Sequence, residues 1–352
     1  MNNQLSNKIK TTSLILMIMV VFLHSYNIDI KQGGKVLFFE KGFNWMIQNF
    51  ISNGVTRIAV PMFFIISGSL FISKPTFDFQ DYKIKISKRF KTLIVPYFCW
   101  TLFGLFFYFI LQSIPASQGF FTKKLIKDYS FYEWVNAIIK EPIPYQLWFL
   151  KDLIVMVFLS PIIYFLVKKL NIIFVLIIFS FWIFNQDTIF LTSEALLFFS
   201  IGIYVQYFNK EIISKSNKYT QYVVITWLLL LLIKTTLGFY DFPLLAQQLF
   251  LKAAILTGII AFWNLIDNKF YLKNIDTQIK KITGFAFFIY VFHEPFLTII
   301  KKAMFSQLAK TPNSYLLVYL LAPIIVIIIS VLVAVFLNKK MLFIYKIITG
   351  NR

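Results

Sequence analysis

The stretch TGFAFFIYVFHEPFLTI, residues 283–299, decides how the rest of the chain is interpreted. It is apolar enough to sit in a bilayer, yet it carries His293 and Glu294 near its centre. The only other histidine, His24, also lies in an apolar run, residues 11–28 (TTSLILMIMVVFLHSYNI). Ionisable groups are costly in hydrocarbon, so they usually face a bundle interior or a wet cavity. One such histidine could merely hydrogen-bond a neighbouring helix, but two of them with a buried Arg and Glu favour a functional site.

The composition is that of a polytopic membrane protein. Hydrophobic residues make up 59% of the chain and charged residues 14%, with a mean hydropathy of +0.73. A soluble domain averages about 45–50% apolar and about 25% charged residues. The net charge of +20 does not indicate nucleic-acid binding, because the basic residues lie in short segments that would face anionic lipid headgroups. A single cysteine, Cys99, excludes an internal disulfide and a cysteine metal site, and we expect no metal.

We expect an all-α transmembrane bundle of about ten helices in a single domain spanning residues 1–352, because a span needs about 20 mostly apolar residues. Residues 43–56 are expected to form a short amphipathic lead-in, and residues 114–146 to lie at the membrane interface. The expected spans are residues 11–28, 57–73, 92–113, 147–167, 171–186, 190–208, 220–238, 244–266, 283–300 and 314–337.

The distribution of Lys and Arg predicts that both termini face the cytosol. With that orientation, the inner segments hold 21 Lys and Arg residues and the outer segments hold 11. Arg57, Lys151 and Lys252 then lie at membrane depth. The bias follows the positive-inside rule, although Lys301 and Lys302 fall on the outer side and count against it.

Two basic features could carry chemistry. Arg57 opens an apolar run, residues 57–71 (RIAVPMFFIISGSLF), in which Gly68 permits close helix packing. Arg57 could bind a carboxylate, a phosphate or a polarised carbonyl, or it could snorkel to the outer headgroups. The cationic run at residues 83–91 (KIKISKRFK) could hold lipid phosphates, or the phosphates of a soluble donor at the mouth of a cavity.

Further charged residues stand in or beside expected spans. Residues 146–158 (QLWFLKDLIVMVF) contain Trp148 and the pair Lys151 and Asp152, and the opposite charges of this pair could neutralise each other near the interface. Glu194 begins its span from the outer side. The sequence contains no nucleophile elbow, P-loop, HExxH or dinucleotide fingerprint, so the chemistries of soluble enzymes are not indicated.

The predicted topology brings several of these groups together. His24 lies late in an outward-going helix, and Arg57 lies early in the return. Glu194 also starts from the outer side, and His293 lies near the middle of an outward-going helix. We expect these groups to meet in the central-to-outer half of the bundle, with the cationic run at the cytosolic mouth. Such a layout suits a reaction across the membrane, with an anionic donor inside and an acceptor outside.

In the order and spacing of its motifs, the chain resembles the membrane acyltransferase-3 family, which acylates surface sugars. The resemblance covers nearly the full length. It rests on LMIMVVFLH in the first span, RIAVPMFFIISGSLF, KRFKTLIVPYFCW, LWFLKDLIVMVFLSP and, late in the chain, FAFFIYVFHEPF. The family implies roughly ten helices, acetyl-CoA as the usual donor and a functional histidine and arginine, which fall on His24 and Arg57. The family's basic motif falls on Lys88, Arg89 and Lys91.

The sequence departs from the family pattern at two places. Many members carry Arg or Lys about three turns before the first-span histidine, where this chain has Ser13. The basic motif is commonly an arginine pair, whereas that spacing falls here on Lys88 and Lys91. Lysine lacks the bidentate fork of arginine, so recognition of donor phosphates would differ in detail. We also expect no appended extracytoplasmic hydrolase-like domain, so that transfer finishes within the membrane domain.

Together these observations predict an integral-membrane O-acyltransferase. Its donor would be cytosolic acyl-CoA, most simply acetyl-CoA, and its acceptor a hydroxyl of a surface polysaccharide or lipid-linked oligosaccharide. His24 would be the general base or transient acyl carrier, Arg57 would stabilise the oxyanion, and His293 and Glu294 would orient the acceptor or relay its proton. The expected donor-binding residues are Lys88, Arg89 and Lys91, and the expected substrate-binding residues are Glu194, Trp148, Lys151 and Asp152.

Two other function classes stay open. A proton-coupled transporter or exporter of glycans or small anions would also bury His, Arg and Glu, although the two halves show no repeat. A purely structural partner in a polysaccharide assembly complex would not need the buried charges. We expect a multi-pass protein of the bacterial plasma (inner) membrane that contacts lipids and no nucleic acid, and leave homo-oligomer formation open.

Overall fold

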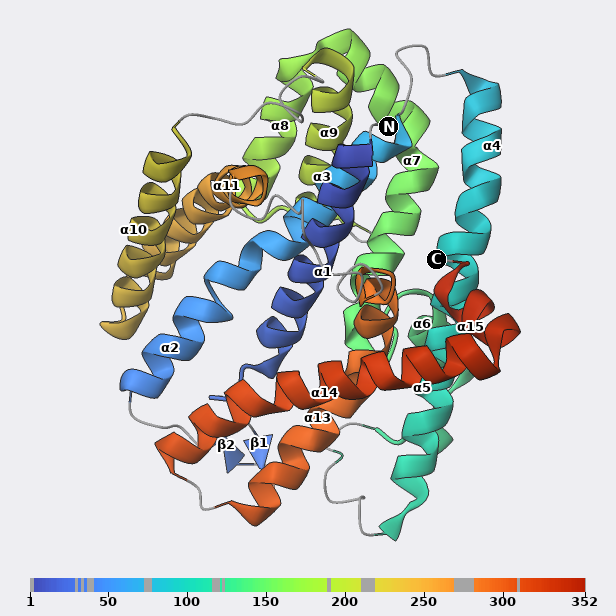
Figure 1. The fold of residues 1–352 in the computed structure, drawn as a ribbon, viewed down its shortest axis with the longest axis vertical. Coiled ribbons are helices and arrows are strands. Elements are labelled where there is room, and N and C mark those ends of the chain that lie inside the picture. Colours follow the sequence, from blue (N-terminus) through green and yellow to red (C-terminus); the bar gives the residue numbers. More distant parts are fainter. Residues whose placement is uncertain are drawn as a thin grey trace.

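The structure is a computed structural model, and it describes residues 3–28, 31–32, 35–36, 41–72, 78–115, 121, 124–188, 191–209, 219–268, 282–308 and 311–351. Within these residues the fold is a helical bundle with one very short antiparallel hairpin (Figure 1). The elements of the N-terminal part are α1 (Asn3–Ser25), β1 (Lys31–Gln32), β2 (Lys35–Val36), α2 (Phe43–Ile51), η1 (Val55–Ile58), α3 (Ala59–Phe71), α4 (Phe79–Arg89), η2 (Phe90–Ile94), α5 (Val95–Ser113), η4 (Ile126–Asp128) and α6 (Phe131–Ile139). The remaining elements are η5 (Tyr145–Leu147), α7 (Trp148–Leu170), α8 (Ile172–Ile183), α9 (Ser193–Phe208), α10 (Thr220–Phe239), α11 (Leu244–Asn268), α13 (Ala286–Gln307), α14 (Pro312–Lys340) and α15 (Leu342–Thr349).

The prediction of an all-α membrane bundle is confirmed. Each of the ten expected spans falls on a helix, and among the described residues seven helices are long and apolar enough to cross a bilayer. The helices α8 and α9 are apolar but shorter, with 12 and 16 residues. The expected lead-in at residues 43–56 is also helical, because α2 and η1 run into α3. The protein is therefore a multi-pass membrane protein.

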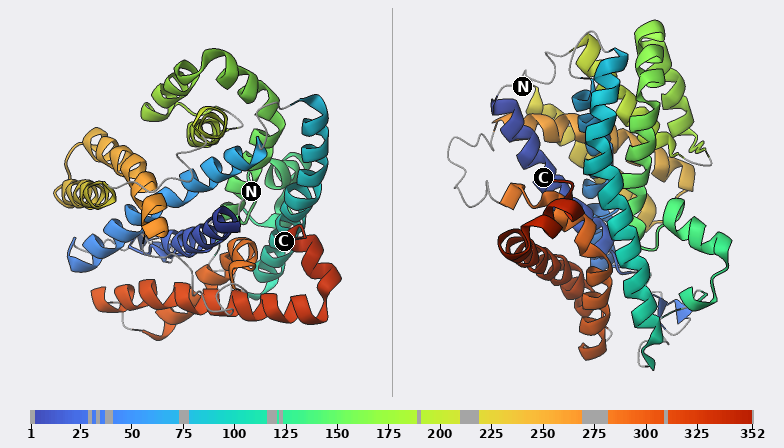
Figure 2. Two further views of the ribbon diagram at one scale, coloured as in Figure 1. Left: turned by 45° about the horizontal axis from the view of Figure 1, so that its top comes forward. Right: turned by 90° about the vertical axis from the view of Figure 1, so that its right-hand side faces the viewer.

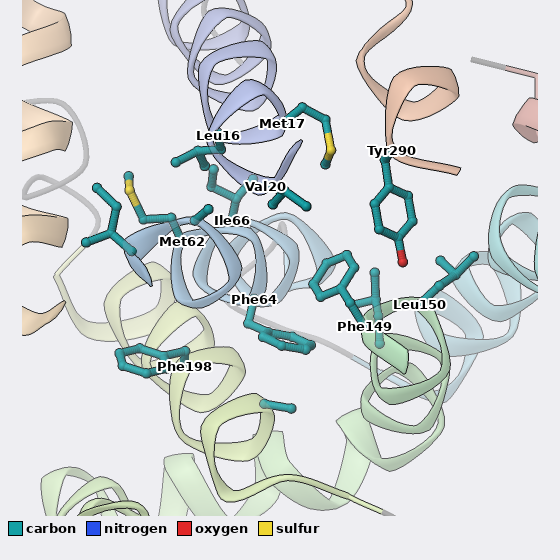
Figure 3. Packing of buried hydrophobic residues seen from close by; sticks show 14 of the residues in the cluster. Leu16, Met17, Val20, Met62, Phe64, Ile66, Phe149, Leu150, Phe198 and Tyr290 are labelled. Atoms are coloured by element: carbon teal, nitrogen blue, oxygen red, sulfur yellow. The ribbon is translucent and has the colours of Figure 1, made fainter. Parts of the chain in front are cut away.

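Helix α1 lies at the centre of the bundle. It contacts α3, α11, α13 and α14, and the other helices surround it when the bundle is viewed toward its upper end (Figure 2, left). The core beside it is built from Leu16, Met17 and Val20 on α1 and from Met62 and Phe64 on α3, all buried (Figure 3). This packing holds the C-terminal half of α1, which carries His24, against its neighbours.

Glycines allow α3 and α9 to approach closely, as the sequence predicted for Gly68. A Cβ on Gly68 would collide with the carbonyl oxygen of Phe199, and a Cβ on Gly202 would collide with the carbonyl oxygen of Ile65. Small residues at such crossings are the usual basis of helix association in membranes. Lipid tails are as apolar as the side chains, so the hydrophobic effect does not drive helices together and close packing must do so. The contact fixes α3 and α9, which begin with the segments that carry Arg57 and Glu194.

We expect Gly68→Val to destabilise the protein by about 3 kcal/mol, the upper end of the range for overpacking, because the obstacle is backbone. Thermal unfolding in detergent measures the change. The control is Leu70→Val, since Leu70 is 37% exposed and loses only one methylene group. Equal unfolding temperatures for the two variants would contradict the close crossing of α3 and α9.

The cationic run is helical rather than a loop. Residues Phe79–Ser113 form one continuous helical stretch in which α4 passes through the π-helical turn η2 into α5. Asp78 caps the start of α4 by accepting a hydrogen bond from the backbone of Asp81. The start of α4 lies toward the same end of the bundle as the N-terminus (Figure 1). This shared end agrees with an inner position for both, since α1 and α4 begin on one side of the bundle.

A buried amide network fixes the chain just after His24. The side chain of Gln48 donates to Asn27 and Asn44, and accepts from the backbone N–H of Asn27. Asn27 in turn donates to the carbonyl of Tyr315 at the start of α14. Buried amides are stable only when their hydrogen bonds are satisfied, so the network defines one position for this turn. It ties α1, α2 and α14 together beside the site.

The expected interfacial segment contains α6, which presents large aromatic side chains outward. Phe131 and Tyr132 are 85% and 76% exposed. The start of α6 is fixed by a capping box between Ser130 and Glu133. Lys124 also donates to Glu133, and these hydrogen bonds lower the pKa of the Glu133 carboxyl to about 2. Exposed aromatic residues beside a fixed helix are typical of the membrane interface, as predicted.

Candidate active site

One cavity lies among the ends of helices that are predicted to face outward. Its volume is about 480 Å³, within the range of about 300–1,000 Å³ that is common for small-molecule sites. Four predicted site residues line it: His24, Arg57, Trp148 and Glu194. The cavity is further lined by Val20, Leu23, Val60, Trp182, Asn185, Gln248, Leu251, Lys252 and Ile255. The cavity brings together three of the four groups that were expected to meet, His24, Arg57 and Glu194.

His24 lies between the cavity and a layer of aromatic rings. Its ring stacks on that of His293 with centroids 5.4 Å apart, and meets the ring of Tyr145 edge-on at 4.9 Å. Lys301 donates to the backbone carbonyl of His24 at 2.8 Å. The ring nitrogens of His24 make no hydrogen bond within the described part of the chain. The imidazole is therefore held by ring packing, and its nitrogens are available to a molecule in the cavity.

The kink in α13 follows from Pro295. Glu294 has extended backbone angles, as residues before proline prefer. Pro295 has no N–H to donate to the carbonyl of Val291, and the side chain of Gln146 donates there instead, at 3.3 Å. Gln146 also donates to the carbonyl of Glu294 at 3.1 Å. Gln146, in the turn η5 that precedes α7, thus satisfies both backbone carbonyls at the break. The break also lets the Glu294 side chain reach partners outside α13.

The carboxylate of Glu294 is buried but fully partnered. Tyr145 donates to one of its oxygens at 3.0 Å, and Thr298 donates to the other at 2.8 Å. His293 beside it is completely buried, and its Nδ1 lies 3.2 Å from the carbonyl of Ile289. Its Nε2 has no hydrogen-bond partner among the described residues. Glu294 therefore positions Tyr145, which packs on His24, while His293 contributes ring contact and one unpaired nitrogen.

Arg57, in η1, and Glu194, in α9, both line the cavity. Arg57 is exposed and, in the described ranges, its guanidinium has no hydrogen bond or ion pair within 4 Å. It lies close enough to Glu194 for the two charges to interact. Glu194 stands in the first turn of α9, whose N-cap is Thr192. A guanidinium with unused donors at a cavity wall can bind an anion or a polarised oxygen.

The predicted pair Lys151 and Asp152 has a different setting. Its members lie 3.3 Å apart, and Asp152 also accepts a 2.9 Å hydrogen bond from Thr192 at the start of α9. The described lining of the cavity includes neither of them. Asp152 therefore ties α7 to the N-terminus of α9, which positions Glu194. The interpretation that the two charges neutralise each other agrees with this geometry better than a direct role in binding substrate.

The predicted donor-binding residues lie away from this cavity. Lys88 and Lys91 are exposed at the end of α4 and in η2, and Arg89 is half-buried. Arg89 lines a shallow groove against Ile154 and Val157 of α7. Lys85, one turn earlier, donates to the carbonyl of Phe71 and so holds the end of α3. Lys88, Arg89 and Lys91 thus place three cations at one helix junction, and no group of three metal-ligating side chains occurs in the described part of the chain.

Sequence reasoning missed several residues of the site. Tyr145 appeared only as part of an interfacial segment, and Lys301 appeared as a charge on the wrong side of the membrane. The hydrogen bond from Lys301 to His24 explains its position, since a lysine held inside the bundle does not report loop orientation. Gln248, Trp182 and Lys252 were not expected at the cavity. Only Lys252 carried a sequence signal, as a charge within an apolar span.

Comparison with known proteins places this arrangement in a family. The family model described as an acyltransferase domain matches residues 14–337. The chain belongs to this acyltransferase-3 family. The acyltransferase is also 25% identical to the succinoglycan biosynthesis protein ExoH of Rhizobium meliloti over 362 residues, which cover all of this chain and 94% of that protein. No solved structure matches the acyltransferase.

Proposed function

We propose that this acyltransferase is an O-acyltransferase of the bacterial plasma membrane, built as one membrane domain. It transfers an acyl group, acetyl in the simplest case, from cytosolic acyl-CoA to a hydroxyl of a surface glycan or its lipid-linked precursor. The observation that carries the proposal is that His24 and Arg57 line the same cavity, and that their side chains have unused hydrogen-bonding capacity among the described residues. The glycan acceptor is supported by the name of the ExoH relative, a succinoglycan biosynthesis protein.

The chemistry follows from the two side chains. The acceptor hydroxyl gives its proton to His24 while its oxygen attacks the thioester carbonyl carbon, and the carbonyl oxygen becomes an oxyanion. The guanidinium of Arg57 stabilises that oxyanion by hydrogen bonds that strengthen as charge develops. The C–S bond then breaks, the carbonyl re-forms, and the proton passes from His24 to the departing CoA sulfur. In a two-step variant His24 itself carries the acyl group.

The neighbours of His24 act by position. Glu294 holds Tyr145 against the imidazole ring, and the lysine at 301 holds the backbone of His24. The His293 ring stacks on His24, and its Nε2 has no hydrogen-bond partner among the described residues. This nitrogen can therefore take part in relaying the acceptor proton. These contacts keep the base in one orientation, which general-base catalysis requires.

The donor would be held by its phosphates on Lys88, Arg89 and Lys91. CoA is too large and too highly charged to cross a bilayer unaided, so a cytosolic face for this cluster is part of the proposal. Both lysines present exposed ammonium groups, which bind phosphate as point charges. The thioester arm would then reach between helices toward His24, while the acceptor enters from the outer side.

A transporter of glycans or small anions remains the competing function class. The unpaired Arg57 in a cavity also suits an anion-binding site. Such a protein has no need to bind acyl-CoA, so donor binding separates the two classes.

We expect the purified protein to bind acetyl-CoA, and the double variant Lys88→Glu, Arg89→Glu to bind it at least about tenfold more weakly, since one or more charge-assisted phosphate contacts are lost. Isothermal titration at two ionic strengths measures the change. Binding by the natural protein should weaken as salt is raised, because exposed charges are screened.

The matched control is Lys168→Glu, Lys169→Glu, which makes the same kind of change at exposed lysines on the end of α7. This control should leave acetyl-CoA binding unchanged. Equal dissociation constants for all three proteins would make the cluster a lipid-headgroup anchor. Failure of the natural protein to bind any acyl-CoA would favour the transporter class.

A further inference from the structure

The cavity has two chemically different walls. One wall comes from α1, η1 and the start of α3, and carries His24 and Arg57, the groups assigned above to acyl transfer. The second wall comes from the end of α8, the start of α9 and the first turns of α11. It consists of Trp182, Asn185, Glu194, Gln248, Leu251, Lys252 and Ile255, and Trp148 of α7 stands between the two walls. The chemistry of the reacting centre accounts for the first wall and leaves the second without a role.

The second wall is rigid because one buried lysine organises it. Lys252 donates to the carbonyl of Trp182 at 2.5 Å, to the carbonyl of Ile183 at 2.7 Å and to the side chain of Asn185 at 2.8 Å. These bonds satisfy the carbonyls that the end of α8 leaves free. Trp182 also packs edge-on against Phe198, with centroids 5.3 Å apart. Lys252 therefore acts within the wall and is not free to bind a ligand.

The same network aims two polar side chains at the cavity. Asn185 donates to the Gln248 carbonyl oxygen at 3.1 Å, which fixes the Gln248 amide. The Gln248 amide nitrogen has no hydrogen bond in the residues that the structure describes. Glu194, which lines the same cavity, supplies carboxylate oxygens. The wall thus offers amide donors and carboxylate acceptors next to an indole surface.

This combination suits a sugar ring. A pyranose has faces of C–H groups that pack on an indole, and hydroxyls around its rim that need donors and acceptors in fixed places. A linear acyl chain would need an apolar wall, and a phosphate would need free cations. The volume of about 480 Å³ admits a sugar residue beside a thioester, and excludes a polysaccharide as a whole.

We propose that Trp182, Glu194 and Gln248 form the acceptor subsite, which binds one sugar residue of the glycan and presents its hydroxyl to His24. The inference rests on the proposed function and adds the residues that select the acceptor. Gln248 and Glu194 read hydroxyl positions, and Trp182 and Trp148 pack on the ring. The acyl group of the donor lies against the other wall, between His24 and Arg57.

The test uses Gln248→Leu, which removes the amide and keeps most of the volume. The probes are acetyl-CoA and the surface glycan of the source strain, stripped of its esters by mild base and cut to oligosaccharides. We expect Gln248→Leu to raise the KM for the oligosaccharide about five- to tenfold, the effect of one hydrogen bond. The KM for acetyl-CoA should stay within twofold. Gln247→Leu, next to it and outside the described lining, should change neither value.

An unchanged oligosaccharide KM in Gln248→Leu would overturn the subsite. A higher KM for acetyl-CoA instead would also overturn it, because the wall would then hold the donor. Direct binding separates this inference from the proposed function. Titration of tryptophan fluorescence with the same oligosaccharides, without donor, should give a saturable change that is lost in Trp182→Phe and weakened in Gln248→Leu. Absence of that change in the natural protein would reject the subsite even if acyl transfer occurs, and its presence would support the subsite even if transfer fails.

Discussion

Replacement of His24 by alanine is expected to lower the rate of acyl transfer at least 10²- to 10⁴-fold, the range for loss of a general base. The substitution removes the imidazole but leaves the backbone carbonyl to which Lys301 donates. The end of α1 should therefore keep its position, which the amide network of Asn27 and Gln48 also holds. Release of CoA from acetyl-CoA in the presence of the de-esterified glycan measures the rate.

The control is Thr12→Ala, in the same helix as His24. Thr12 is fully buried and its hydroxyl has no hydrogen-bond partner among the described residues, so its removal should cost little. Both variants should bind acetyl-CoA as tightly as the natural protein and unfold at similar temperatures. Transfer at the natural rate by a well-folded His24→Ala protein would remove His24 from the chemistry.

Arg57→Gln is expected to lower kcat by about 10²- to 10³-fold, which is typical for the loss of one oxyanion contact. Its effect on the dissociation constant of acetyl-CoA should be small, because the stabilised charge exists only in the transition state. Arg57→Lys should recover part of the rate, since lysine keeps the charge and lacks the planar fork. Single-turnover kinetics on the three proteins give both quantities.

A rise in KM with unchanged kcat in Arg57→Gln would show that the guanidinium only binds substrate in the ground state. The neutralising substitution Lys127→Gln serves as the control, because Lys127 is an exposed cation in the segment beside α6. It should change neither constant. An equal effect of both substitutions would point to the overall field rather than to the oxyanion.

The sequence predicted the helices well because lipid imposes a simple rule. Long apolar runs must become helices, so each of the ten expected spans falls on a helix, and among the described residues seven helices are long and apolar enough to cross a bilayer. The meeting of His24, Arg57 and Glu194 at one cavity also agreed with an argument from topology alone. That argument needs only the depth of each residue in the membrane, which follows from its position along its helix.

Side-chain partners could not be predicted in the same way. The sequence suggested that Lys301 lies in an outer loop and that Asp152 binds substrate. Each side chain instead hydrogen-bonds to a neighbouring helix. The second wall of the cavity depends on how α8 and α11 pack. No local sequence pattern therefore predicted that Gln248 or Trp182 would line the cavity. Helix rotation about its own axis decides which side chains face a cavity, and apolar composition alone does not specify that angle.

The central claim is that this membrane protein esterifies a surface glycan, and mass spectrometry of that glycan tests it most directly. Glycan would be isolated from the source strain, from a strain lacking the gene, and from that strain complemented with the natural protein or with His24→Ala. We expect an acyl ester that is lost on deletion, restored by the natural protein and not restored by His24→Ala at equal membrane abundance. An ester content that is the same in all four samples would contradict the account.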